Sequence, residues 1–170
     1  MNKVLNFAAF QAGWFACILG AANGMPWLGP IVVAAFLAAM LVTRRDRGAF
    51  TLRMTGAAGI GFIADTVLLR MGILDFGNDA FSPLWMTALW PNLAATLDSS
   101  LGWLSGRYFL AALFGAVGGP LAYYAGARLG ALRLDLSPSA FAAIACEWLA
   151  AFPLMVLLAD RTVPKQEALA

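Results

Sequence analysis

Three carboxylic acids lie inside stretches of the chain that are otherwise apolar enough to enter a membrane. Asp65 lies in "GFIADTVLL", Asp98 in "AATLDSSLG" and Glu147 in "AIACEWLA". A charged side chain at the centre of a membrane helix costs about 2.5–3.5 kcal/mol. Such groups therefore usually face the protein interior, where they either form interhelical hydrogen bonds or mark a pathway for protons, ions or substrates.

Two amides, Gln11 and Asn92, lie in stretches of the same kind. At a helical rise of about 1.5 Å per residue, Asn92 falls near the membrane midplane, and Gln11 and Asp98 fall on one side of it. Gln11 is therefore the expected partner of Asp98. Asp65 and Glu147 have similar depths on the other side, so we expect them to lie close together. These five residues form a candidate intramembrane polar site.

Enzyme chemistry finds little support in the sequence. The chain has no histidine, which excludes a Ser-His dyad and His-based metal hydrolysis. Ser99 and Ser100 follow Asp98, but neighbouring residues on a helix point about 100° apart, which is poor geometry for a dyad. Cys17 and Cys146 have no metal-ligand spacing, and we expect both thiols to be buried. We therefore expect no metal and no cofactor, and we favour a protein that is not an enzyme.

Composition predicts the kind of element that holds these residues. Of the 170 residues, 62% are hydrophobic and 12% are charged, and the mean hydropathy is +0.78. A soluble domain is about half apolar and about a quarter charged, so we expect an integral membrane protein. The net charge of +2 is small, and no basic run resembles a nucleic-acid patch. The expected partners are the lipid bilayer, lipid-modifying enzymes or a second copy of the chain, and not nucleic acid.

Six stretches have the length of a membrane span, which needs about 20 mostly apolar residues. They are residues 4–22, 27–43, 54–74, 84–103, 109–127 and 139–159. The arginine-rich "RRDRGAFTLR" between the second and third stretches indicates a cytoplasmic loop. With six spans, both termini are then cytoplasmic. We expect an all-α bundle of about six transmembrane helices in one domain, residues 1–160, followed by a short polar tail, residues 161–170.

The fourth stretch has the most polar groups. Pro91 lacks an amide hydrogen and leaves a carbonyl free one turn earlier, near Thr87. At membrane depth such a carbonyl is tolerated only where protein or water satisfies it. Because Asn92, Thr96 and Ser99 lie on a further stripe, we expect this helix to lie at the bundle centre or to line a cavity.

Small residues recur at every fourth position in the first and fifth stretches. This spacing lets helix backbones approach closely in lipid and predicts tight helix packing. The two series are Ala9, Gly13, Cys17 and Ala21, and Ala111, Gly115 and Gly119.

Three segments resemble a family of small bacterial inner-membrane proteins that is known only as a domain of unknown function, DUF2878. They are "FQAGWFACILGAANGMPWLGP", "LWMTALWPNLAATLDSSLGWL" and "GAVGGPLAYYAGARLGAL", about a third of the chain, and they contain no enzyme motif. The resemblance implies a multi-pass protein of the bacterial inner membrane. It also implies a tie to membrane lipids, because genes of members often lie beside genes for cyclopropane-type fatty-acid modification and for redox enzymes.

Two functions from different classes follow from these observations. The favoured one is an accessory or lipid-linked membrane protein, associated with the modification of fatty-acyl chains, that offers an apolar cavity or a docking face. The alternative is a small transporter or permeation subunit that uses the buried acids. Discontinuous helices at the midplane, such as the one containing Pro91, form the substrate sites of many transporters.

Overall fold

A computed structural model describes residues 2–77 and 80–162 of the chain, and it is built almost entirely from helices. They are α1 (Lys3–Ala22), α2 (Leu28–Thr43), α3 (Arg47–Arg70), α4 (Leu84–Ala94), α5 (Tyr108–Arg128) and α6 (Pro138–Thr162), with a single 3₁₀ turn, η1 (Gly102–Leu104), before α5. Two short strands, β1 (Leu74–Asp75) and β2 (Arg133–Leu134), pair antiparallel and join the α3–α4 and α5–α6 connections. The predicted all-α class is confirmed.

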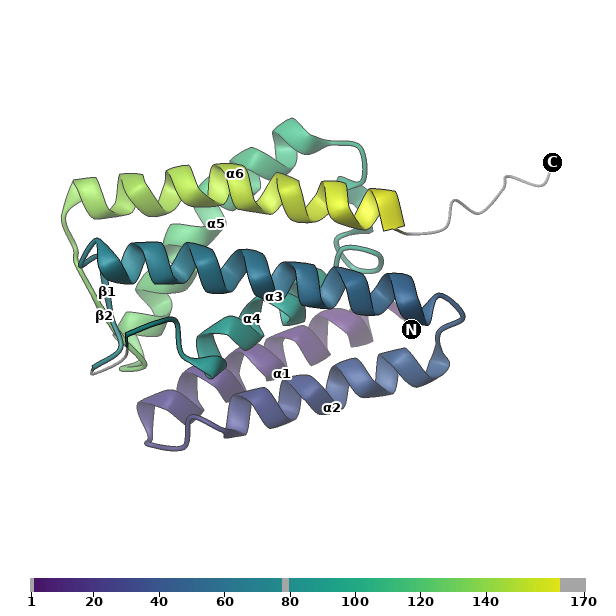
Figure 1. The fold of residues 1–170 in the computed structure, drawn as a ribbon, viewed down its shortest axis with the longest axis horizontal. Helices are drawn as coiled ribbons and strands as arrows, with labels where there is room; N and C mark the ends of the chain where they lie inside the picture. The colour runs from purple at the N-terminus through teal and green to yellow at the C-terminus, as the bar shows by residue number, and fades with distance from the viewer. Residues whose placement is uncertain (1, 78–79, 163–170) are drawn as a thin grey trace.

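The helices differ in their ability to cross a membrane. Four of them, α1, α3, α5 and α6, are long and apolar enough to span one. The apolar helix α2 has 16 residues, and α4 has 11. At about 1.5 Å per residue α4 is roughly 16 Å long, about half of the ~30 Å hydrocarbon core. The chain therefore has a membrane-like bundle in which α4 lies between α1, α2 and α3 (Figure 1).

Three predicted helix boundaries are wrong, and one of them is the end of α3, which lies at Arg70 rather than at Leu74, a residue of β1. Helix α3 begins at Arg47 rather than at Met54, because the arginines of its first turns find acceptors, as where Arg47 donates to the Val42 carbonyl. The helix expected over residues 84–103 ends at Ala94. Turns and η1 cover residues 95–104. The polar tail expected over residues 161–170 lies outside the described residues from 163 onward, and residues 161–162 still belong to α6.

The two ends of the bundle have different characters. Figure 1 shows the start of α1, the α2–α3 turn, the segment between α4 and α5, and the end of α6 at one end. We call this the arginine end, because it contains Arg44, Arg45, Arg47 and Arg107. The opposite end, which we call the strand end, contains the α1–α2 turn and the β1–β2 pair.

Close helix packing occurs at the small residues, as predicted. A Cβ atom added at Gly115 of α5 would lie 2.6 Å from the backbone oxygen of Trp148 in α6, and one added at Gly13 of α1 would lie 2.8 Å from the Asn92 amide of α4. Cys17 is buried where α1 meets α2, but Cys146 is exposed, so the expectation of two buried thiols is wrong for Cys146.

Candidate functional site

Asp65 lies in the interior of the bundle and connects three helices. Its side chain has no exposed surface. The carboxylate accepts a hydrogen bond of 2.9 Å from the indole Nε1 of Trp90 in α4, one from the hydroxyl of Tyr123 in α5, and a long one of 3.5 Å from Ser82. Because its acceptors meet protein donors, Asp65 is buried without being left unpaired.

Glu147 of α6 has a different environment. Its carboxylate lies near enough to Asp65 and to the Tyr123 hydroxyl for their charges to interact. Both carboxylate oxygens are buried, and neither has a hydrogen-bond partner among the described residues. The neighbouring Trp148 ring stacks on Trp90, with 4.8 Å between the ring centroids. Asp65 and Glu147 therefore lie in the same part of the bundle interior, where Trp90, Tyr123 and Trp148 pack together.

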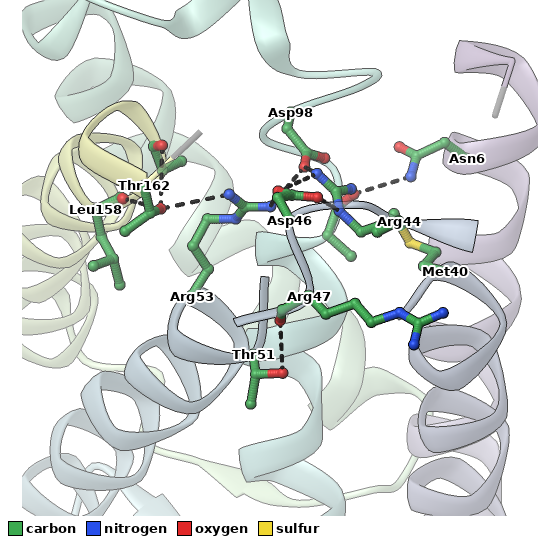
Figure 2. A network of polar contacts seen from close by, with 12 residues as sticks. Asn6, Met40, Arg44, Asp46, Arg47, Thr51, Arg53, Asp98, Leu158 and Thr162 are labelled. Atoms are coloured by element: carbon green, nitrogen blue, oxygen red, sulfur yellow. Dashed lines mark hydrogen bonds and ion pairs between the residues drawn. The ribbon is translucent and has the colours of Figure 1, made fainter. Parts of the chain in front are cut away.

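Asp98 lies far from that pair, in a cluster of charges at the arginine end. Figure 2 shows Arg44, Asp46, Arg53 and Asp98 meeting between the α2–α3 turn and the segment after α4. Oδ2 of Asp98 lies 2.6 Å from Nη2 of Arg44 and 2.9 Å from Nη2 of Arg53. Both arginines also pair with Asp46, at 2.7 Å and 3.3 Å. This cluster joins three segments of the chain with balanced charge.

The hydrogen bonds within this cluster change the titration of Asp46. Arg44 donates two hydrogen bonds to the Asp46 carboxylate, of 2.7 Å and 3.0 Å. They favour the ionised form and lower the pKa of Asp46 to about 2. Asp46 precedes α3 in the connecting turn, so its charge also lies close to the positive N-terminus of that helix.

Gln11 is not the partner of Asp98, and that expectation is wrong. The pairing requires a continuous helix over residues 84–103 that places Asp98 at the depth of Gln11, whereas the chain leaves the helix after Ala94 and carries Asp98 to the arginine end. Gln11 instead lines a cavity described below. The arginines that pair with Asp98 belong to "RRDRGAFTLR", the run whose charge predicts a cytoplasmic loop.

Asn92 joins α4 to α1 at a separate place. Its Nδ2 donates a 2.9 Å hydrogen bond to the Phe10 carbonyl, and the missing side chain of Gly13 makes room for its amide. The five predicted site residues therefore do not form one site. Asp65 and Glu147 lie together, whereas Asp98, Asn92 and Gln11 each have other neighbours.

A further buried amide, Asn6, explains the end of α4. Its Nδ2 donates to the Ala95 carbonyl at 3.0 Å, and its Oδ1 accepts from the Ser100 hydroxyl at 2.7 Å. These bonds satisfy backbone and side-chain groups of a segment that no longer forms a helix. The only signal in the sequence was an asparagine within an apolar first helix, and sequence reasoning did not assign it a partner.

An apolar cavity with a volume of about 270 Å³ lies between α1 and α5. Its lining is aromatic and aliphatic apart from Gln11, and α4 and α6 form its floor. The residues that line it are Phe7, Phe10, Gln11, Trp14, Ile18, Met86, Leu89, Trp90, Leu93, Leu101, Phe114, Gly115, Gly118, Ala122, Tyr123, Leu132, Trp148 and Phe152.

The cavity is narrow at the strand end and open toward the arginine end. At the strand end the helices converge, since a Cβ atom at Gly126 of α5 would lie 3.3 Å from Ile18 of α1. Toward the arginine end the facing walls include Phe7 of α1 and Phe114 of α5, which are 48% and 47% exposed. The space between the two helices therefore opens sideways, where a membrane helix faces lipid.

Comparison with known proteins gives a family but no activity. A family model described as "Protein of unknown function (DUF2878)" matches residues 3–154. No curated protein and no solved structure matches the chain. Within the described part of the chain, no group of three or more histidine, cysteine or acidic residues is placed to hold a metal ion.

Proposed function

The chain belongs to the family of proteins of unknown function DUF2878. Because the family gives no activity, we propose a function from the geometry of the cavity. The protein is a non-catalytic, multi-pass protein of the bacterial inner membrane that binds one acyl chain of a membrane lipid between α1 and α5. Holding a chain in this way suits an accessory protein that presents or stores acyl chains for lipid-modifying enzymes. The arginine end then faces the cytoplasm.

The observation that carries this proposal is the apolar cavity that opens sideways between two membrane helices. Its volume is about 270 Å³. If a methylene group fills the ~30 Å³ that a water molecule occupies in the liquid, the cavity has room for about nine methylenes. That is enough for a large part of one acyl chain and too little for a whole lipid.

The cavity wall is fixed before a ligand enters. Trp90 and Tyr123 present their rings to the cavity, while their polar atoms bind the Asp65 carboxylate. Asp65 itself does not line the cavity, so the buried charge orients the rings without making the cavity polar. A pocket whose side chains are held by a further layer of hydrogen bonds loses less entropy on binding.

The buried acids support the transporter alternative less well. Asp98 is neutralised by two arginines, and Asp65 is surrounded by donors from the protein. None of the three acids, Glu147 included, lines the cavity, and the cavity contains one amide side chain, that of Gln11. A polar pathway would need such groups along its wall.

Fluorescence quenching by phospholipids with brominated acyl chains tests the proposal. Trp14, Trp90 and Trp148 line the cavity, so a background with Trp27, Trp85 and Trp103 changed to Phe reports on it. The blocking variant is Gly118→Leu, because no atom lies within 4 Å of a Cβ added there. Its matched control is Gly59→Leu on the exposed face of α3, which is equally free of neighbours.

We expect saturable quenching in detergent micelles that Gly118→Leu abolishes and Gly59→Leu preserves. Both variants should retain the thermal stability of the parent, because neither creates a clash. Equal quenching in the two variants would show that the lipid lies around the protein and not in the cavity, and the proposal would be wrong.

A further inference from the structure

We infer that the acyl chain held in this cavity carries a hydroxyl group near its middle, and that the side-chain amide of Gln11 binds this hydroxyl. The inference rests on the proposed function, because it assigns a chemical class to the chain that lies between α1 and α5. Gln11 is the one amide in a lining that is otherwise aromatic and aliphatic. An amide in such surroundings needs a hydrogen-bonding partner, because an unpaired polar group costs free energy in an apolar medium.

Two other amides in the apolar part of the bundle have partners in the protein. Asn6 and Asn92 have no exposed surface. Asn6 bonds to the segment after α4, and Asn92 donates to the Phe10 carbonyl of α1. Gln11, in contrast, forms no hydrogen bond with the described residues, and its amide atoms keep accessible surface. Its amide is therefore free to bind a ligand in the cavity.

Most other polar side-chain atoms of the lining are already engaged or buried. The indole nitrogen of Trp90 and the hydroxyl of Tyr123 bind the buried carboxylate of α3, and the indole nitrogen of Trp148 is buried. Trp14 is the exception, because its Nε1 keeps accessible surface and forms no hydrogen bond with the described part of the chain. It follows Gln11 by three residues and shares a helix face with it. The free polar groups of the lining therefore lie on one stripe of α1.

The position of Gln11 along α1 corresponds to the middle of an acyl chain. Helix α1 has 20 residues and begins at Lys3, so its length of about 30 Å matches the hydrocarbon core of a membrane. Gln11 follows Lys3 by eight residues, which is about 12 Å along the helix axis. The ester groups of a lipid lie at the edge of the hydrocarbon core, and the opening beside Gln11 faces lipid, which supplies no water. The partner of the amide must therefore belong to the chain itself, and a hydroxyl both donates and accepts hydrogen bonds as an amide does.

Competition against the brominated lipids tests the inference in the same tryptophan background. The competitors are phosphatidylcholines of equal chain length whose chains are unmodified, hydroxylated near the middle, or hydroxylated beside the ester. A neutral hydrogen bond strengthens binding roughly five-fold, so the lipid with the mid-chain hydroxyl should displace the brominated lipid at a roughly five-fold lower concentration than the unmodified lipid. A hydroxyl beside the ester should bring no such gain, because it lies too far from Gln11.

Variants of the amide show whether Gln11 is the binding group. Gln11→Met keeps the length of the side chain without its amide, so the preference for the mid-chain hydroxyl should disappear while unmodified chains still bind. Thr55→Met is the matched control, because it removes a polar group from the exposed face of α3 and not from the cavity lining. It should keep the preference. Phe7→Gln/Gln11→Met moves the amide one turn toward the arginine end along the lining and should shift the preferred hydroxyl position toward the ester.

The outcomes separate the two proposals. If unmodified chains displace the brominated lipid as well as chains with a mid-chain hydroxyl do, the cavity binds chains and the hydroxyl inference is overturned. A preference that survives in Gln11→Met overturns it as well. If the brominated lipids give no saturable quenching, the proposed function fails and the inference with it. The comparison of hydroxyl positions needs no change at Gln11, so it decides the inference even if Gln11→Met does not fold, and equal displacement by the two hydroxylated lipids would overturn it.

Discussion

The indole Nε1 of Trp90 donates a 2.9 Å hydrogen bond to Oδ2 of Asp65, whose side chain has no exposed surface. Through this bond a carboxylate of α3 fixes the ring that forms part of the cavity floor. Tyr123 of α5 is held by the other oxygen of the same carboxylate. One buried acid thereby sets the positions of two aromatic rings on two further helices.

Asp65→Asn should destabilise the protein. The amide offers one acceptor in place of two, so either Trp90 or Tyr123 keeps a buried donor without a partner. An unsatisfied buried donor costs about 1–3 kcal/mol. The thermal unfolding midpoint in detergent should therefore fall, and brominated lipids should quench less strongly because the rings are no longer fixed. A midpoint equal to that of the parent protein would remove the orienting role of Asp65.

Glu147→Gln should behave in the opposite way. Neither oxygen of Glu147 has a hydrogen-bond partner among the described residues, and another acid lies nearby. The amide keeps the shape of the side chain and carries no charge, so no interaction is lost. The unfolding midpoint should stay the same or rise. A clear fall in the unfolding midpoint, comparable with that of Asp65→Asn, would contradict this prediction. It would mean that the Glu147 carboxylate makes a stabilising interaction.

Asp98→Leu should be strongly destabilising. It leaves the Arg53 guanidinium, whose side chain is 3% exposed, with a 3.3 Å contact to Asp46 and a long 3.5 Å hydrogen bond to Thr162. Removing one member of a buried ion pair costs about 3–5 kcal/mol, whereas replacing both members costs much less. In the double variant Arg53→Leu/Asp98→Leu the loss should be smaller than the sum of the two single losses. Additive losses in this double-mutant cycle would mean that the two charges do not interact.

The ion pair of Asp46 should make the stability of the arginine end depend on pH in the acid range. Hydrogen bonds from Arg44 lower its pKa from 3.8 to about 2. A lowered pKa in the folded protein stabilises the fold fully above the unfolded value, and this contribution is lost as the pH falls through the folded value. The stability difference between the parent and Asp46→Asn should thus be largest above pH 3.8 and shrink toward pH 2. A difference that stays constant over this range would contradict the ion pair.

Hydropathy predicted most of the helices because a membrane span is a long apolar run. The starts of α1 and α2 and both ends of α5 lie within about one residue of the predicted bounds. It failed at α3 because Arg47 and Arg53 form helix turns once acceptors are nearby. It failed at α4 because bonds from Asn6 to Ala95 and Ser100 stabilise a non-helical segment. Both failures come from tertiary hydrogen bonds, which a count of apolar residues does not contain.

The candidate site was predicted less well than the helices. Depth along a helix was enough to suggest that Asp65 and Glu147 are neighbours, and the structure places them near each other. The partner of Asp98 depended on where α4 ends, so the inferred pairing with Gln11 failed. The cavity had no signal of its own, because an aromatic residue that lines it resembles one that faces lipid. A residue that lines the cavity differs from one that faces lipid only because α1 and α5 leave a space between them, and the sequence does not show that space.

Photolabelling tests most directly whether an acyl chain occupies the cavity. Phosphatidylglycerol with a diazirine in one acyl chain would be incorporated into vesicles with the protein, irradiated, and the labelled peptides identified by mass spectrometry. The account predicts labels concentrated on cavity residues such as Phe10, Trp14 and Ala122, and their loss in Gly118→Leu. Labels spread over exposed apolar residues such as Ile31, Val42 and Leu149, with no excess in the cavity and no effect of Gly118→Leu, would contradict it.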